Sequence, residues 1–163
     1  ILFQERAVDK RYVALVNGRL LPESGEVDLP LIVDWPNRPL HKVDFEIGKP
    51  SLTRFQVTGY DTENHASRVS LIPETGRTHQ LRLHTSHPLG LGCPIAGDRL
   101  YGNGQLGEQL CLHAAYLCFL HPVGGWRMRF CSQPPFFTTL NGFNPAFLET
   151  ALNLCRTTLE EHD

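Results

Sequence analysis

Polar side chains are densest in residues 73–102 of this sequence, and their types suit binding of an anion. The stretch carries arginines, histidines, an amide, a carboxylate and a phenol, at positions Arg77, His79, Gln80, Arg82, His84, His87, Asp98, Arg99 and Tyr101. Guanidinium groups and the backbone N–H groups of loops and helix starts both favour negative charge. The stretch therefore favours a site for phosphate or nucleic acid.

Two other interpretations of these residues compete with the anion site. His84 and His87 have a spacing that two metal ligands on one helix can have, with His79 farther round, but no carboxylate stands at ligand spacing. We therefore expect no metal. A purely structural polar network stays open, because T-G-R and G-D turns also satisfy backbone groups.

The elements expected to position these side chains are mainly short strands. Alternating apolar and polar residues predict strands over 51–60, 66–72 and 126–131, with turns at 61–64 and at Gly124-Gly125. β-Branched and aromatic residues predict a strand over 10–17, and a long apolar run predicts a buried strand over 110–120. A short helix is expected over 78–87, with Thr78 as its N-cap. Residues 20–40 contain four prolines and are expected to form an irregular loop.

The C-terminal part of the sequence predicts a separate helix. Asn144 is a suitable N-cap, Pro145 suits the first helical position, and apolar residues recur every three or four positions after them. We expect residues 1–143 to form the main body and residues 144–163 a helix packed on it.

Composition places the chain in the α+β class, with a mostly antiparallel or mixed β-sheet and few helices. The 163 residues are 41% hydrophobic and 20% charged, and 14 glycines and 12 prolines favour turns over long helices. The net charge of −2 does not indicate a strongly basic nucleic-acid binder, although an arginine-lined groove remains open. Five cysteines without a C-x-x-C pair predict free thiols in a reducing compartment.

Four ordered motifs resemble the RluA family of pseudouridine synthases. They are KRYVALV, GRTHQLRLH followed by HP, PIAGDRLYG and LCLHA, and the resemblance spans about Leu2 to Phe136. The segments VDLPLIVDWPNRPLHKV and GKPSLTRF resemble members that act on both 23S rRNA and a tRNA anticodon stem-loop. The resemblance implies a pseudouridine synthase-like fold, a cytoplasmic isomerase of structured RNA, and no cofactor or metal.

The resemblance also implies roles for individual residues. Arg82 matches the cation beside the catalytic carboxylate, Tyr12 the tyrosine against the flipped base, and Leu112 the apolar residue under the uracil. Arg77, His79 and Gln80 match residues that shape the site and contact phosphate. Without the motifs, Tyr12 is a half-buried strand tyrosine, Arg82 a surface arginine and Leu112 a core residue.

One family motif has no counterpart in this sequence. The family's nucleophilic aspartate lies in an H-R-L-D segment upstream of K-x-Y, and no segment here matches it. We therefore expect a fold that is incomplete on its N-terminal side, inactive alone, and able to self-associate through an unpaired sheet edge. A non-catalytic RNA-binding module and a remnant without RNA affinity stay open as alternatives.

Overall fold

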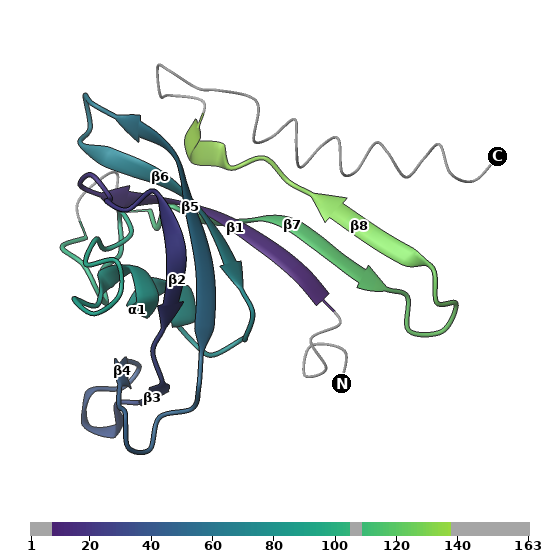
Figure 1. The fold of residues 1–163 in the computed structure, drawn as a ribbon, viewed down its shortest axis with the longest axis horizontal. Helices are drawn as coiled ribbons and strands as arrows, with labels where there is room; N and C mark the ends of the chain where they lie inside the picture. The colour runs from purple at the N-terminus through teal and green to yellow at the C-terminus, as the bar shows by residue number, and fades with distance from the viewer. Residues whose placement is uncertain (1–7, 105–108, 138–163) are drawn as a thin grey trace.

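The computed structural model describes residues 8–104 and 109–137, and its main feature is one antiparallel sheet (Figure 1). Every pair of neighbouring strands in it is antiparallel. The six strands, in spatial order, are β2 (Ser24–Asp28), β5 (Leu52–Asp61), β6 (Ala66–Pro73), β1 (Val8–Asn17), β7 (Leu112–Leu120) and β8 (Arg127–Cys131). This architecture confirms the predicted α+β class.

Smaller elements lie beside this sheet. A second, two-stranded sheet pairs β3 (Leu31–Val33) with β4 (His41–Val43), and the helix α1 (Gln80–Ser86) packs near β4 and β6. Two 3₁₀ turns complete the elements, η1 (Trp35–Asn37) and η2 (Pro135–Phe137). Figure 1 shows α1, β3 and β4 grouped on one side, while the β7–β8 hairpin extends away from them.

The central strand β1 is buried on both faces, because its side chains alternate between two cores. Ala14 and Val16 join a cluster with residues of α1, β2, β5 and β6, whereas Val13 and Leu15 join a smaller cluster with Ala115 of β7. Successive side chains of a strand point to opposite faces, so the apolar residues of β1 enter both cores. Tyr12 lies on the same face as Ala14 and packs at the border of the larger cluster.

The irregular loop predicted for residues 20–40 is wrong, because this stretch contains β2 and β3. Its prolines lie outside the strands rather than within them: Pro22 precedes β2, Pro30 separates β2 from β3, and Pro36 lies in η1. Proline is tolerated at such positions because no ladder hydrogen bond is lost there. The predicted strands over 10–17, 51–60, 66–72, 110–120 and 126–131 are all present, with ends shifted by up to two residues.

Three smaller predictions have mixed outcomes. Cys93, Cys111 and Cys118 are free thiols, but Cys131 forms a disulfide, so the prediction of free thiols is wrong at that position. The predicted helix 144–163, and with it the boundary at residue 143, lies outside the described residues. In the described part of the chain, no helix has the length and hydrophobicity needed to span a bilayer.

A buried histidine links α1 to β5 through hydrogen bonds that occupy both of its ring nitrogens. The Nε2 of His84 lies 2.9 Å from Ser51 Oγ, and its Nδ1 lies 2.9 Å from Thr53 Oγ1. Ser51 donates its own proton to the carbonyl of Leu29, so His84 Nε2–H is the donor to Ser51. The ring is therefore neutral, and burial lowers its pKa from 6.5 to about 4.

We expect His84 to make the fold sensitive to acid. The unfolded chain binds this proton below about pH 6.5, whereas the folded protein resists it until about pH 4, so stability falls as pH drops through this window. The full shift corresponds to about 3 kcal/mol. Urea titrations at pH 7 and pH 4.5 measure the loss. His84→Gln is expected to reduce this pH dependence of stability, whereas His121→Gln, at a partly exposed histidine, is expected to preserve it; equal pH dependence in both variants would contradict this assignment.

Candidate functional site

One pocket brings together all six residues that the sequence singled out. Its volume is about 240 Å³, and it lies between β1, the turn after β6, the first turn of α1 and the start of β7. The lining residues are Lys10, Tyr12, Pro73, Thr75, Gly76, Arg77, His79, Gln80, Leu81, Arg82 and Leu112. Residues separated by a hundred positions in sequence thus meet in one cavity.

Strand geometry aims two of these side chains at the pocket. Lys10 and Tyr12 are two residues apart on β1, so they project from the same face of the sheet. The ladder between β1 and β7 shifts register between Arg11 and Tyr12, so that Ala115 of β7 is paired with no residue of β1. Bulges of this kind re-aim side chains beside functional sites. Leu112, at the first position of β7, forms the apolar part of the wall.

The turn from Thr75 to Arg77 is held in place by Gln80. The Oε1 of Gln80 accepts bonds from Thr75 Oγ1 (2.7 Å) and from the N–H of Arg77 (3.0 Å). Its Nε2 donates to the carbonyl of Leu52 and to Thr53 Oγ1, both at 3.0 Å. Its side chain has two donors and two acceptor sites, and all four are occupied. Gln80 therefore shapes the pocket wall, and we expect it to make no direct contact with phosphate.

Arg82 forms a two-point ion pair with Asp98. Its Nε donates to Asp98 Oδ2 at 2.8 Å and its Nη2 to Oδ1 at 2.5 Å, and the carboxylate is fully buried. Asp98 also accepts the N–H groups of Leu100 and Tyr101. Burial alone would raise the pKa of Asp98, but these four bonds outweigh it and hold the pKa below its ordinary value.

A glycine makes the position of Asp98 possible. Gly97 has a φ of +77°, and a Cβ there would lie 2.1 Å from the carbonyl oxygen of Gln109. Only glycine fits such a close approach with positive φ. Asp98 thus holds Arg82 from the side that faces away from the pocket, and Arg82 still lines the pocket.

His79 occupies a strained position at the start of α1. It adopts the left-handed conformation, with φ 57° and ψ 15°, where we had expected Thr78 to cap the helix. Such conformations persist where surrounding contacts enforce them, and they cluster at functional sites. Here the enforcing contact is Tyr101, whose hydroxyl lies 2.8 Å from His79 Nδ1.

The hydroxyl of Tyr101 bridges the backbone of His41 and the ring of His79. The hydroxyl of Tyr101 accepts the backbone N–H of His41 at 2.8 Å, so its own proton is available to His79 Nδ1. Burial, and then the charge of Arg82, lower the pKa of His79 and favour its neutral form. Its Nε2–H, which has no partner in the described part of the chain, is then a donor for a pocket ligand.

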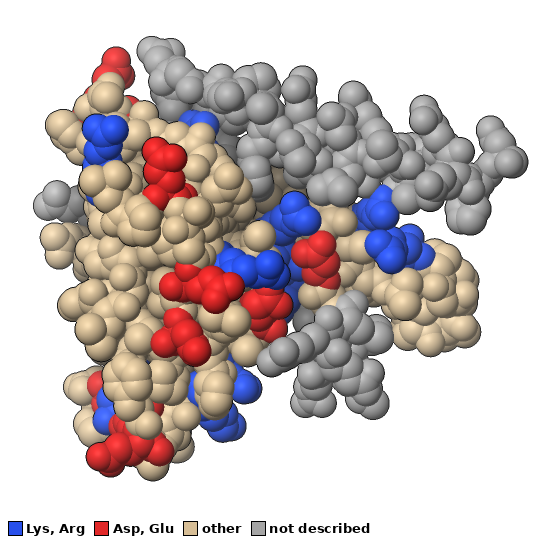
Figure 2. Space-filling view, viewed as in Figure 1, with Lys and Arg blue, Asp and Glu red and all other residues tan. Residues whose placement is uncertain are grey.

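The pocket is a site of positive potential. Its lining includes Lys10, Arg77 and Arg82 but no described aspartate or glutamate, because Asp98 lies behind Arg82 and not in the wall. On the face shown in Figure 2, acidic and basic side chains are intermixed. The positive charge is thus local to the cavity, which is compatible with the net charge of −2 for the whole sequence.

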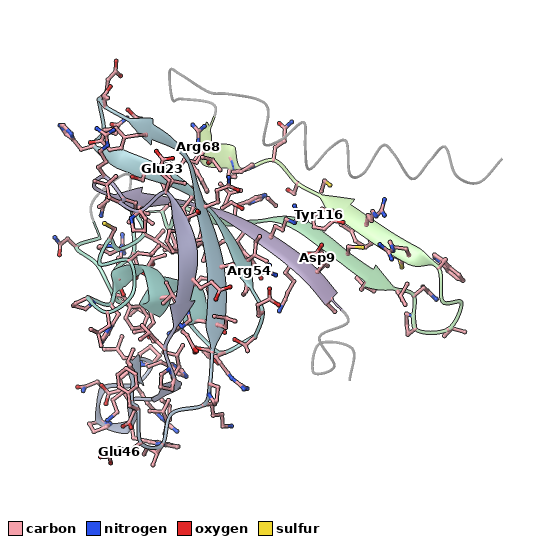
Figure 3. All side chains as sticks on the ribbon, in the orientation of Figure 1. Asp9, Glu23, Glu46, Arg54, Arg68 and Tyr116 are labelled. Carbon is pink, nitrogen blue, oxygen red and sulfur yellow. The ribbon has the colours of Figure 1, made fainter. Side chains whose placement is uncertain are left out.

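A more polar groove adjoins the pocket and shares Lys10 and Pro73 with it. Figure 3 labels two residues of its lining, Asp9 on β1 and Arg54 on β5. The charges there are paired: Asp9 lies 3.7 Å from Arg11, and Arg54 binds Glu74. This groove is therefore less available to an anion than the pocket.

Metal chemistry has no candidate ligand set in the described ranges. Among residues 8–104 and 109–137, no three His, Cys, Asp or Glu side chains gather as a metal site would require. His84, which the sequence offered as a ligand, is instead committed to Ser51 and Thr53.

Comparison with known proteins identifies the family. Residues 2–87, just over half of the chain, match the family model for RNA pseudouridylate synthase. The chain belongs to this family. It is 49% identical over 137 residues to the dual-specificity RNA pseudouridine synthase RluA of Pasteurella multocida, and 48% identical over 137 residues to that of Escherichia coli K12. In both comparisons the alignment covers 82% of this chain and 61% of the relative.

Two solved pseudouridine synthase-family structures resemble this one. Human RNA Pseudouridylate Synthase Domain Containing 1 superposes with a TM-score of 0.73 at 28% identity, covering 93% of this chain and 68% of that chain. Human RNA Pseudouridylate Synthase Domain Containing 4 gives 0.62 at 28% identity, covering 84% and 62%. The pseudouridine synthase-like fold expected from the sequence is confirmed. The chain spans about three fifths of the length of the curated relatives it matches.

Two residues that support the pocket were not singled out from the sequence. Asp98 and Tyr101 were grouped with the other polar residues, but their roles as partners of Arg82 and His79 were not predicted. The G-D-R-L-Y-G segment indicates the position of Asp98, because the N–H groups two and three residues after an aspartate can donate to its carboxylate.

Proposed function

We propose that this chain forms the uridine-binding side of an RNA pseudouridine synthase active site. The observation that carries the proposal is the convergence of Tyr12, Arg77, His79, Arg82 and Leu112 on one positively charged pocket. Aromatic and apolar walls suit the two faces of a flipped base, while the cations suit the phosphates on either side of it.

Each side chain has a distinct task in this proposal. Tyr12 stacks on the uracil and Leu112 supports its other face. Arg77 holds a flanking phosphate, because its guanidinium is exposed and anchored through Nε to the carbonyl of Pro50 at 3.2 Å. His79 Nε2–H donates to a base or sugar oxygen.

Arg82 would act on the catalytic carboxylate. Two of its nitrogens are committed to Asp98, which leaves Nη1 to pair with a further carboxylate at the pocket. In the family reaction that carboxylate is the nucleophile that allows the glycosidic bond to break. The base then turns over and rejoins through carbon, without metal or cofactor.

A non-catalytic RNA-binding role is the second candidate, and a specific feature favours it for this chain by itself. No described aspartate or glutamate lines the pocket, so the described residues provide a place for the uridine but no nucleophile. We therefore propose that the isolated chain binds RNA without converting it. Detection of pseudouridine after incubation with the isolated chain would refute that restriction and leave the synthase assignment standing.

The partners proposed for the chain are 23S rRNA and a tRNA anticodon stem-loop, in the cytoplasm. The support is the similarity to relatives named dual-specificity RNA pseudouridine synthases. Self-association through an edge strand also stays a prediction. Among the described strands β2 and β8 end the six-stranded sheet, and β8 carries the half-exposed Phe130.

We expect Tyr12→Ala to weaken RNA binding about tenfold, because stacking of a base on an aromatic ring contributes about 1–3 kcal/mol. The probe is a fluorescein-labelled RNA stem-loop with a single uridine in its loop, measured by fluorescence anisotropy. Tyr12→Phe keeps the ring and should bind nearly as the wild type does. Tyr60→Ala is the matched control, since Tyr60 lies on β5 outside the pocket and contacts Arg19. Equal affinities for Tyr12→Ala and Tyr60→Ala would contradict the proposal.

A further inference from the structure

A second pocket lies on the other side of the turn that carries Arg77. Its volume is about 330 Å³, and it is enclosed by the small β3–β4 sheet and by residues 76–78. The lining residues are Leu31, Ile32, Val33, His41, Lys49, Gly76, Arg77 and Thr78. The proposed uridine site does not use this cavity.

The two pockets share part of their wall. Gly76 and Arg77 line both of them. Because Gly76 has no side chain, the wall at that point is backbone alone, and a Cβ built there would approach Lys10 Nζ, on the first pocket's side, at 3.6 Å. A ligand that crosses this wall would therefore meet Arg77 midway.

Arg77 is prepared to hold an anion at the crossing point. Its Nε is committed to the carbonyl of Pro50, which fixes the guanidinium, while neither Nη atom has a hydrogen-bond partner among the described residues. A planar guanidinium with two free N–H donors matches the geometry of a phosphate. A phosphodiester is the anion that would join ligands in the two pockets.

The lining of the second pocket suits a nucleotide. Of the three β3 residues in the lining, Leu31 and Val33 lie on the same face of the strand, and they give an apolar surface against which a base can pack. Lys49 adds a second cation, and its backbone is fixed to β3 by two bonds of 2.9 Å with Leu31. The pocket has no aspartate or glutamate among its described lining residues, so a phosphate meets no repulsion there.

His41 connects the two pockets and has an unsatisfied ring nitrogen. Its ring meets that of His79 edge-on at 5.3 Å, and its backbone N–H donates to Tyr101, which holds His79. Its Nδ1 is buried without a hydrogen-bond partner in the described part of the chain. A buried polar atom left unpaired is costly, and because this atom has no exposed surface a ligand in the second pocket reaches His41 through the rest of its ring.

We propose that the second pocket binds the nucleotide next to the uridine, with the phosphate between the two nucleotides held by Arg77. The inference rests on the proposed function, which places the uridine in the first pocket. It adds that the enzyme reads a dinucleotide step, so that β3 and β4 take part in choosing which uridine is bound. Lys49 and His41 become specificity residues for the neighbouring nucleotide.

The test uses the full 163-residue chain and the same fluorescein-labelled stem-loop, together with versions made abasic at the nucleotide 5′ or 3′ of the uridine. Lys49→Ala is compared with Lys42→Ala, which removes the same charge from β4 but outside both pockets. Lys42 is paired with Asp44 at 3.4 Å and is half-exposed. Anisotropy titrations give the affinity of each variant for each RNA.

We expect Lys49→Ala to bind the intact RNA about tenfold more weakly than Lys42→Ala does. One of the two abasic RNAs should bind the wild type about tenfold more weakly, and on that RNA Lys49→Ala should lose at most a further twofold. The effects of the Lys49 substitution and of base removal are not additive, because a nucleotide without its base no longer enters the pocket and Lys49 then has nothing to hold.

Two results would overturn the proposal that the second pocket binds this nucleotide. One is equal behaviour of Lys49→Ala and Lys42→Ala on every RNA. The other is a Lys49→Ala loss that is the same for intact and abasic RNAs, because that would place Lys49 on a distant phosphate. Both are distinguishable from failure of the uridine site, which is reported separately by Tyr12→Ala on the intact RNA.

Discussion

Replacing Asp98 with alanine is expected to lower the free energy of unfolding by about 3–5 kcal/mol, the cost of breaking a buried ion pair from one side. The substitution leaves Arg82 without its two-point partner, and it leaves the N–H groups of Leu100 and Tyr101 without an acceptor. Since Tyr101 positions His79, the pocket should also lose affinity for RNA. Urea unfolding, followed by circular dichroism, measures the stability change.

Two further variants test the origin of this loss. Asp98→Asn keeps the shape of the side chain but removes its charge, and we expect it to retain only a minor part of the stabilisation that Asp98 provides. Asp61→Ala is the matched control, since Asp61 accepts the N–H groups two and three residues ahead just as Asp98 does, but at an exposed turn. Equal losses for Asp98→Ala and Asp61→Ala would show that the turn matters and the buried ion pair does not.

Arg77→Glu is expected to lower the affinity for RNA about 100-fold at low salt. A hydrogen bond to a charged group contributes about 1.5–3 kcal/mol, and the reversed charge adds repulsion toward the phosphate. Together these give about 2.7 kcal/mol, or two factors of ten. Arg77 is exposed and donates one bond to Pro50, so the fold should survive. Anisotropy with the labelled stem-loop measures the affinity and circular dichroism checks the fold.

Salt dependence separates a local effect of Arg77 from a general effect of charge. If Lys10, Arg77 and Lys49 each meet one phosphate, log K should fall with log salt concentration with a slope of about −2, and Arg77→Glu should reduce its magnitude by about 0.7. Arg127→Glu makes the same change in net charge on β8, outside both pockets. The same loss in Arg127→Glu would mean that RNA senses only the overall field.

The sequence predicted the large sheet well because its strands carry a strong local signal. Alternation along residues 52–61 and the β-branched and aromatic residues of 10–17 both favour strands, and neither pattern depends on distant residues. The two strands missed in residues 20–40 are short. Their prolines suggested an irregular loop, yet these strands form because β2 pairs with the edge of β5 and β3 pairs with β4, contacts that no local pattern shows.

The candidate site was predictable in its members but not in its connections. Motifs indicated Tyr12, Arg82 and Leu112, and all three line the pocket. The pairing of Arg82 with Asp98, sixteen residues away, depends on the positive φ of Gly97 and on the path of the loop after α1. Likewise, the exclusion of Gln80 from direct contact follows only from its four occupied hydrogen-bond positions. Such connections arise from tertiary packing.

Removing the uracil base from the labelled stem-loop, and measuring its affinity for the wild-type chain and for Tyr12→Ala, tests the central claim most directly. The account predicts that the abasic RNA binds the wild type about tenfold more weakly, the cost of one lost stacking contact. Wild type and Tyr12→Ala should bind the abasic RNA equally, because without the base the Tyr12 ring has nothing to stack on. Equal binding of intact and abasic RNA by the wild type would contradict the claim that this pocket holds a uridine.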